Sequence, residues 1–150
     1  MLNDLPQSVL EEALRWIDVV SIQPYGNQFE QEDFDRIYKI VRRPIIICDH
    51  AVNFPTERYP ITGWPASINE EHAARAHAEY IADAFNRTYI VGYHRCHYID
   101  NYMPKNGFVM QGLLREDLTP YAVMLDAIGR TNKGITLNLK NGSLSRNKRA

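Results

Sequence analysis

Polar and charged side chains are concentrated between residues 91 and 100. This short segment holds an Arg, two His, two Tyr and an Asp. Successive side chains of a strand point to opposite faces. We therefore expect two polar faces, with Tyr93, Arg95 and His97 on one and His94, Cys96 and Tyr98 on the other. Because burying Arg95 or His97 without a partner is costly, the segment predicts either a structural polar network or, as we favour, a functional site at the carboxyl end of a strand.

A second candidate site residue, Asp49, follows the continuous apolar run 45–48. Such a run is typical of a parallel strand covered on both faces, and it ends abruptly in Asp49-His50. The strand predicted before it ends in Gln23, two residues ahead of Tyr25. Since sites in parallel α/β folds lie at the carboxyl ends of the strands, we expect these side chains to lie together. A capping or salt-bridging role for Asp49 is the alternative.

The composition narrows the classes of function. The chain has 150 residues, the length of a single domain, and a net charge of −1 with both signs interspersed, so we expect no nucleic-acid partner. No apolar run approaches the roughly 20 residues of a membrane span, and no membrane association is expected. Met1 to Asp4 lack the features of a secretion signal, and the compartment stays open. We interpret Cys48 and Cys96 as buried free thiols and expect neither a cofactor nor a bound metal.

Helical and extended patterns alternate along the chain. Apolar spacing predicts helices that open at Asp4-Leu5-Pro6, cover 30–41, run from the capping-box sequence Ser67-Ile68-Asn69-Glu70 to about 85, and start at Thr119-Pro120. Extended patterns predict strands at 19–23, 44–49 and 89–98, and a half-exposed strand at 135–139 followed by an Asn141-Gly142 turn. Loops at 51–66 and 101–112 follow two of the strands. This order favours a parallel α/β sheet covered by helices.

Three segments of the chain carry a family resemblance. They are Asp-Val-Val-Ser-Ile-Gln-Pro-Tyr at 18–25, Arg-Pro-Ile-Ile-Ile-Cys-Asp at 43–49, and 92–100 together with Gln111-Gly112-Leu113 and Thr119-Pro120-Tyr121. They resemble the sixth, seventh and eighth strands of (β/α)8-barrel glycoside hydrolases, especially retaining enzymes of the agarase and β-galactosidase type. In the eighth strand His94, Tyr98 and Asp100 match the family pattern, whereas Arg95 and His97 replace a Trp and a Gln.

The resemblance implies the C-terminal portion of a TIM (β/α)8 barrel, strands six to eight with their helices, plus a short C-terminal β element. We expect residues 1–140 to form this partial barrel and 141–150 a flexible basic tail. A complete barrel takes about 250 residues, and the strand that carries the family's general acid is absent. The chain would then be a piece of a barrel, or a subunit that association completes. Its expected partners are a carbohydrate substrate and either a second copy or the missing barrel half.

The resemblance also implies roles for the site residues. Asp49 stands where the family has a nucleophilic Glu, with a side chain shorter by about 1.5 Å, and a misplacement of that order can cost about a hundredfold in rate. It is an adjusted nucleophile, an electrostatic stabiliser or a relic. Arg95 would pair with Asp49 or bind an acidic sugar group, and Tyr59 would stack on sugar rings. The other candidates for substrate binding are Gln23, Tyr25, His50, Trp64, His94, His97 and Asp100.

Two alternative functions stay open. A metal-dependent hydrolase would draw its ligands from His50, His94, His97 and Asp100. His94 and His97, however, would project to opposite faces of a strand. Retaining hydrolysis needs two carboxyl groups about 5–5.5 Å apart, and the chain offers one convincing member, so a non-catalytic carbohydrate-binding fragment is the second alternative. His72 and His77, on the alanine-rich helix, are expected to face solvent.

Overall fold

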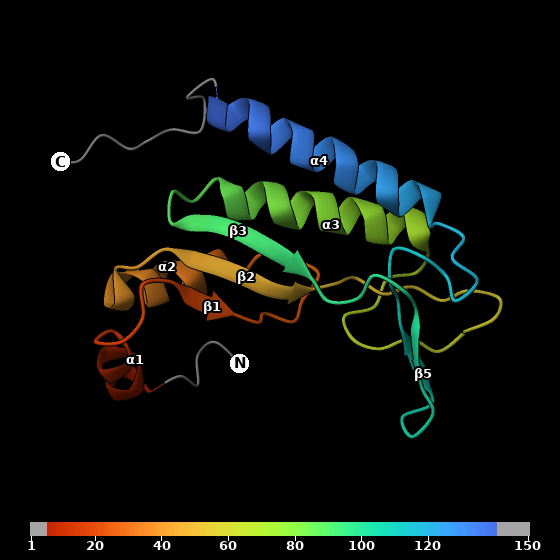
Figure 1. Cartoon of the computed structure of the whole chain (residues 1–150), viewed down its shortest axis with the longest axis horizontal. Helices are drawn as coiled ribbons and strands as arrows, with labels where there is room; N and C mark the ends of the chain where they lie inside the picture. The colour runs from red at the N-terminus through yellow and green to blue at the C-terminus, as the bar shows by residue number, and fades with distance from the viewer. Residues whose placement is uncertain (1–5, 141–150) are drawn as a thin grey trace.

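Three parallel strands form the central sheet of the protein (Figure 1). The computed structural model describes residues 6–140, so the predicted turn and tail at 141–150 lie outside it. In the order β1-β2-β3, the strands are β1 (Val20–Ile22), β2 (Ile45–His50) and β3 (Ile90–Arg95). Both neighbouring pairs are parallel. The predicted order and direction of these strands are confirmed, and the chain is a mixed α/β protein.

One face of the sheet is covered by two helices, α2 (Gln31–Val41) and α3 (Glu70–Phe85). In α2, the apolar residues Phe34, Ile37 and Val41 recur at helical spacing, which places them on one buried face. Alternate strand residues meet these helices, because successive side chains of a strand point to opposite faces. The resulting core contains Val20, Ile22, Ile45, Ile47 and Ile90 of the sheet, Phe34, Ile37 and Val41 of α2, and Tyr80, Ile81 and Ala84 of α3.

The opposite face of the sheet is open. It carries Ser21, Cys48 and His94, all of them exposed or half-buried. Within residues 6–140, no helix packs against this face. In the same part of the chain, β1 and β3 each pair only with β2, so their outer edges have no neighbouring strand. The sheet is therefore covered on one side, and its two edges are free to pair.

The last helix, α4 (Ala122–Lys140), runs alongside α3 (Figure 1). The predicted strand at 135–139 is therefore wrong, because these residues continue α4. Met124, Ile128 and Ile135 return to about the same side of a helix, and each packs against a buried cluster. Leu137, which gave the segment its alternating appearance, is mostly exposed. The apolar residues of a helix with one apolar side can thus alternate over a few positions, as they do in a strand.

The start of α3 differs from the capping-box prediction. The N-cap is Asn69, whose side chain accepts a hydrogen bond from the His72 backbone N–H at 2.8 Å. Asn is among the preferred N-cap residues. The Ser67 hydroxyl lies outside the helix and contacts His72 Nδ1 instead. The helix begins two residues later than a cap at Ser67 would place it.

The start of α4 is capped from α3. Glu70 Oε1 accepts hydrogen bonds from the backbone N–H groups of Val123 at 2.9 Å and Met124 at 3.1 Å. The predicted capping residue Thr119 instead donates its backbone N–H to Asp117 Oδ1 at 2.9 Å. One carboxylate thus satisfies two N–H groups that the first turn of α4 leaves without helical partners.

Three smaller elements complete the structure. The helix α1 (Gln7–Ala13) precedes β1 and contacts α2. The strands β4 (Asn101–Met103) and β5 (Phe108–Met110) form an antiparallel hairpin in the segment predicted as a loop. This hairpin projects beyond the carboxyl ends of the parallel strands (Figure 1). No helix in the described part of the chain is long and apolar enough to cross a membrane.

Candidate active site

Asp49 lies at the carboxyl end of β2 in a left-handed backbone conformation, with φ at 55°. The regular pairing of β2 with β3 is interrupted between Ile47 and His50, so the strand is irregular at this point. Gln23, which follows β1, donates a hydrogen bond from Nε2 to Asp49 Oδ2. The expected meeting of Gln23 and Asp49 at neighbouring strand ends is therefore present in the structure.

Tyr25 and Cys96 lie within electrostatic reach of the Asp49 carboxylate. Burial, and then the negative charge of Asp49, raise the pKa of Tyr25. The same two causes, in the same order, raise the pKa of the Cys96 thiol. Both cysteines of the chain are free, as expected, but they are partly exposed rather than buried. Residues that follow β1 and β3 thus surround a carboxylate at the end of the middle strand.

A row of side chains crosses the open face of the sheet next to Asp49. The Ser21 hydroxyl donates to Cys48 Sγ at 2.8 Å, and Cys48 Sγ lies 3.9 Å from His94 Nδ1. His94, a predicted site residue, is therefore on the open face. Ser21 and Cys48 were not among the candidates. The alternation of Ser21 with the buried Val20 and Ile22 was the signal that could have indicated its position.

Arg95 lies on the helix-covered side rather than beside Asp49. Its Nη2 donates to the backbone oxygens of Gln111 at 3.4 Å and Gly112 at 3.2 Å. Burial lowers the pKa of its guanidinium to about 10. The expected ion pair with Asp49 is not formed within residues 6–140. Arg95 instead fastens the segment that follows the β4–β5 hairpin, and this position does not support contact with an acidic sugar.

His50 pairs with a histidine that we expected to face solvent. His77 of α3 is 0% exposed and His50 is 1% exposed, so the expectation for His77 is wrong. Their Nδ1 atoms lie 3.3 Å apart, a distance at which one neutral imidazole donates to the other. Burial lowers the pKa of both rings, that of His77 to about 3. The buried face of α3 consists mostly of alanines, so the sequence pattern did not indicate that His77 is buried.

Two buried amide side chains join the long loops that follow β2 and β3. Asn53 Oδ1 accepts from the Gln111 backbone N–H at 2.8 Å, and Gln111 Oε1 accepts from the Phe54 backbone N–H at 2.7 Å. Asn53 Nδ2 also donates to the backbone oxygens of Gly63 at 3.1 Å and Pro65 at 3.2 Å. These bonds hold the loop that carries Trp64, whose side chain is 65% exposed. Its predicted sugar contact stays a prediction.

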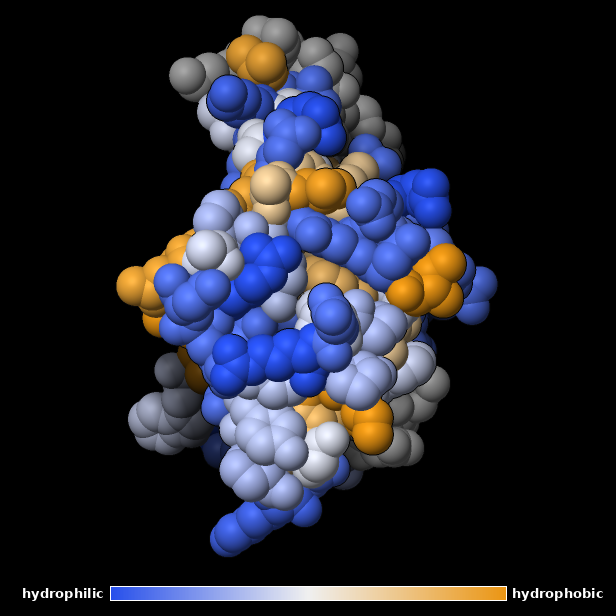
Figure 2. Space-filling model, turned by 90° about the vertical axis from the view of Figure 1, so that its right-hand side faces the viewer, coloured by the Kyte–Doolittle hydropathy of each residue, from blue (hydrophilic) through white to orange (hydrophobic). Residues whose placement is uncertain are grey.

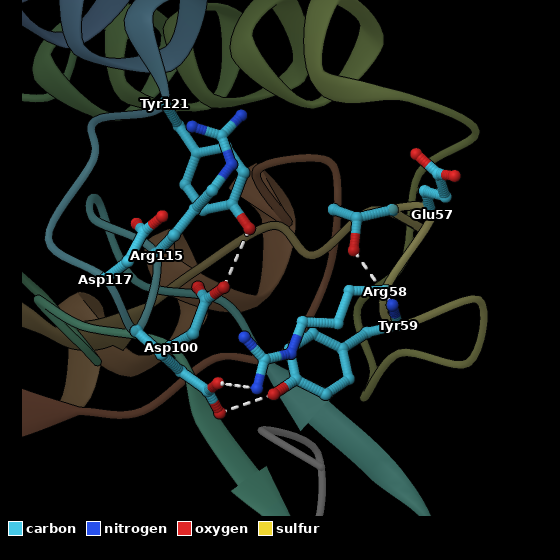
Figure 3. Close-up of a pocket in the computed structure, with 9 residues that line it drawn as sticks. Glu57, Arg58, Tyr59, Asp100, Arg115, Asp117 and Tyr121 are labelled. Carbon is cyan, nitrogen blue, oxygen red and sulfur yellow. Dashed lines mark hydrogen bonds and ion pairs between the residues drawn. The ribbon is translucent and has the colours of Figure 1, made fainter.

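Asp100, another predicted site residue, is buried and holds two segments together. Its Oδ1 accepts from the Gly112 backbone N–H at 2.9 Å, and its Oδ2 accepts from the Tyr121 hydroxyl at 2.7 Å. The guanidinium of Arg115 lies over the Tyr121 ring, 4.2 Å from its centroid. Figure 3 shows the Asp100–Tyr121 hydrogen bond among the residues that line a pocket of about 590 Å³. Asp100 thus has a structural role in the wall of this pocket.

The other wall of the pocket is also held by internal contacts (Figure 3). Glu116 forms an ion pair with Arg58 at 2.6 Å and accepts a hydrogen bond from the Tyr59 hydroxyl. The Tyr59 ring stacks on the Tyr102 ring at 5.5 Å between centroids. The charged groups therefore mostly satisfy one another. They stabilise the loops around the site more directly than they offer themselves to a ligand.

The four residues considered as metal ligands do not come together. His50 is paired with His77, His94 lies beside Cys48 on the open face, and Asp100 is bonded to Gly112 and Tyr121. His97 follows β3 and is partly exposed. Within residues 6–140, no group of three potential ligand side chains is placed to hold a metal ion. The structure therefore gives the metal-dependent alternative no support.

Four exposed aromatic residues lie in the segments that follow the strands of the parallel sheet. Tyr25, Trp64, Tyr98 and Tyr102 all follow a strand of the sheet and are exposed. Figure 2 shows the end of the molecule that carries these segments, with a largely hydrophilic surface and separate apolar patches. Aromatic rings on a polar surface combine an apolar body with a polar edge. This combination suits sugars, which have apolar faces and hydroxyl rims.

Comparisons with known proteins define the fold. No family model matches the sequence, and no curated protein is a detectable relative. Among solved structures, an exo-β-agarase is 21% identical with a TM-score of 0.79, over 88% of this chain and 18% of that chain. A second agarase is 20% identical with a TM-score of 0.77, over 87% and 21% of the two chains. A β-galacturonidase from Eisenbergiella tayi, bound to galacturonate, is 16% identical with a TM-score of 0.58, over 80% and 24%.

These similarities confirm the resemblance inferred from the three strand segments. At such identities they show the fold alone, which is that of a part of these glycoside hydrolases. The chain spans about a fifth of the length of the agarases that it matches. The class that the fold defines is therefore a portion of a glycoside hydrolase-like fold.

Proposed function

We propose that this chain is the carboxyl-terminal part of a (β/α)8-barrel glycoside hydrolase acting on O-glycosidic bonds of poly- or oligosaccharides. Three parallel strands covered by helices on one side are what a section of a barrel wall would contain. The open face would then line the barrel interior. The observation that supports the activity most is Asp49, a carboxylate at the carboxyl end of the middle strand that Gln23 orients from the neighbouring strand.

In this proposal Asp49 is the nucleophile of a retaining reaction. Its carboxylate attacks the anomeric carbon, the glycosidic C–O bond breaks, and a general acid protonates the departing oxygen. Water then hydrolyses the glycosyl ester and restores the carboxylate. The Tyr25 hydroxyl, whose pKa is raised, stays protonated at neutral pH and can donate a hydrogen bond to the carboxylate or to a sugar hydroxyl. The general acid would come from the remainder of the barrel.

Covalent trapping tests the role of Asp49 separately from that of the general acid. A dinitrophenyl 2-deoxy-2-fluoro-glycoside has a leaving group that departs without protonation, and its fluorine slows hydrolysis of the ester. We expect about one equivalent of dinitrophenolate and a mass increase on the peptide that contains Asp49. Asp49→Asn should remain unlabelled with its fold intact, and His72→Gln should label like the parent protein. Labelling of another residue, or full turnover by Asp49→Asn, would contradict the assignment.

Carbohydrate binding without turnover is the second candidate function. The exposed Trp64 and Tyr98 near the strand ends favour it, because they offer stacking surfaces that need no catalytic carboxylate. Calorimetric titration with a neutral galactose-containing oligosaccharide separates the two functions. Binding without covalent labelling, weakened by Trp64→Ala but unchanged by Asp49→Asn, would select the binding function.

A further inference from the structure

Asp49 is held in a conformation that residues with a side chain seldom adopt. Within residues 6–140, the other non-glycine residues with positive φ are Arg42, which ends α2, and Leu118, which lies in a connection. Asp49 instead lies inside a strand, between Cys48 and His50. Left-handed residues persist where the surrounding structure enforces them. A specific restraint is therefore expected next to Asp49.

His50 provides this restraint, because it is fixed from two elements. Its Nδ1 lies 3.3 Å from His77 Nδ1 of α3, and its ring centroid lies 4.1 Å from that of Tyr80 on the same helix. From the other side, its backbone oxygen accepts the Cys96 N–H at 3.4 Å, just after β3. The residue after Asp49 is thus locked into the layer between sheet and helix, while Asp49 itself turns to the open side.

The contact between the two histidines is the polar restraint in this layer. Within the described chain, the Nε2 atoms of both rings and the Nε and Nη1 atoms of Arg95 are buried without a hydrogen-bond partner. The groups that face the pair are Tyr80 from α3 and Tyr93 and Arg95 from β3. None of these brings a negative charge at neutral pH. Both rings therefore stay neutral, and one Nδ1–H can donate to the other Nδ1.

We propose that His77 and His50 are positioning residues that hold the end of β2 so that the Asp49 carboxylate faces Gln23, Tyr25 and Cys96. His77 acts through His50 and touches neither Asp49 nor a substrate. The catalytic meaning of this inference rests on the proposed function, but the position of Asp49 can be measured without any turnover. Sequence reasoning placed His50 in the substrate site and His77 in solvent, and the structure instead joins them behind the carboxylate.

Cys96 provides a local probe of where the Asp49 carboxylate lies. The negative charge of Asp49 contributes to the raised pKa of this thiol. The pH midpoint of Cys96 alkylation by iodoacetamide, followed by peptide mass spectrometry, reports that charge. In the parent protein, we expect Asp49→Asn to lower the midpoint. This decrease measures the coupling between the two groups, whereas general loosening of the fold would raise the alkylation rates of Cys48 and Cys96 at every pH.

The test compares the coupling in three backgrounds. His77→Phe keeps an aromatic ring but cannot bond His50, and we expect the decrease caused by Asp49→Asn to shrink to less than half. His77→Gln keeps a polar group that can reach His50, and this variant should preserve most of the decrease caused by Asp49→Asn. His72→Gln, on the same helix but beside Ser67, should preserve all of it. Undiminished coupling in His77→Phe would overturn the proposal.

Two further measurements keep the result interpretable. A thermal melt establishes whether His77→Phe folds. If His77→Phe does not fold, His77→Asn replaces it, because the shorter amide side chain of Asn does not reach His50. Covalent trapping in the parent protein reports the proposed nucleophile independently. Loss of coupling in His77→Phe without trapping in the parent protein would support the positioning role and contradict the glycosidase function. Trapping in the parent protein with unchanged coupling in His77→Phe would support the glycosidase function and contradict the positioning role.

Discussion

Asp49 and His50 are adjacent in the chain but occupy opposite environments. Asp49 is half-buried at the open side of the sheet and accepts a hydrogen bond from Gln23. His50 is buried under α3 and pairs with His77. The left-handed backbone at Asp49 separates the two side chains. The opposite directions of the Asp49 and His50 side chains therefore depend on the positive φ angle of Asp49. The residue types in this segment do not by themselves require that angle.

The buried histidine pair predicts that acid destabilises the protein before most carboxylates titrate. Burial lowers the pKa of His50 well below its ordinary value and that of His77 to about 3, whereas an unfolded histidine has a pKa of about 6.5. Between these values the unfolded chain binds protons that the folded chain does not. The free energy of unfolding should therefore fall as pH decreases below about 6.5, by up to about 1.4 kcal/mol per pH unit for each histidine.

Urea unfolding between pH 7.5 and pH 5 measures this slope. His77→Gln should reduce the pH dependence of the free energy of unfolding by about the contribution of one histidine. His72→Gln is the matched control variant on the same helix. An identical pH slope in His77→Gln and in the parent protein would contradict the neutral buried pair.

The sequence allowed part of the site to be predicted. Gln23 and Asp49 meet as expected because parallel strands bring their carboxyl ends to one edge. The orientation of Arg95 away from Asp49 was not predictable, since it depends on register irregularities between β2 and β3. His77 was missed because alanines neighbour it on the buried face of α3, and their small side chains give a weak periodic signal.

Among the elements, α3 and α4 are joined by a carboxylate as well as by packing. Glu70, the first residue of α3, accepts the first free N–H groups of α4, and buried alanines of α3 lie in one cluster with Met124. The α4 segment shows why the prediction of elements was incomplete. Its apolar residues alternate at the carboxyl end, and only the packing against α3 selects the helical period over the extended one.

Removal of the Glu70 carboxylate should destabilise the protein at this junction. We expect Glu70→Ala to lower the free energy of unfolding by about 0.5–2 kcal/mol, the range found for the loss of a helix cap. Glu71→Ala is the matched control, because Glu71 is also acidic and in the first turn of α3 but is exposed. Surface substitutions of this kind change stability by about 0.5 kcal/mol or less. Equal effects of the two substitutions in urea unfolding would argue against the cap.

For the whole molecule, the uncovered sheet has the largest consequence. Strand edges without a neighbour are templates for pairing with another chain. On β3, an outer strand of the sheet, Val91 is 55% exposed. The order of the parallel strands was predictable from alternating helix and strand patterns. The apolar run 45–48 predicted a strand covered on both faces, whereas one face has no cover within residues 6–140, because local patterns do not report what lies across a sheet.

We propose that the isolated chain self-associates or docks onto a complementary barrel portion through this face. Light scattering should give a mass above that of one chain. Val91→Lys, which places a charge on the outer strand β3, should raise the fraction of monomer. Leu137→Lys is the control on the outside of α4, where the side chain is 58% exposed. A monodisperse monomer with a cooperative thermal transition would count against the proposal.

The amide side-chain bonds that join Asn53 and Phe54 to Gln111 have a mechanical consequence. Each side chain takes the place of a backbone partner in the other loop, so the two loops are fastened much as two strands of a sheet are. Asn53 Nδ2 binds the backbone oxygens on both sides of Trp64, and Gln111 is followed by Gly112, whose N–H binds Asp100. We therefore expect a ligand that displaces one of the segments after β2 and β3 to displace the other as well.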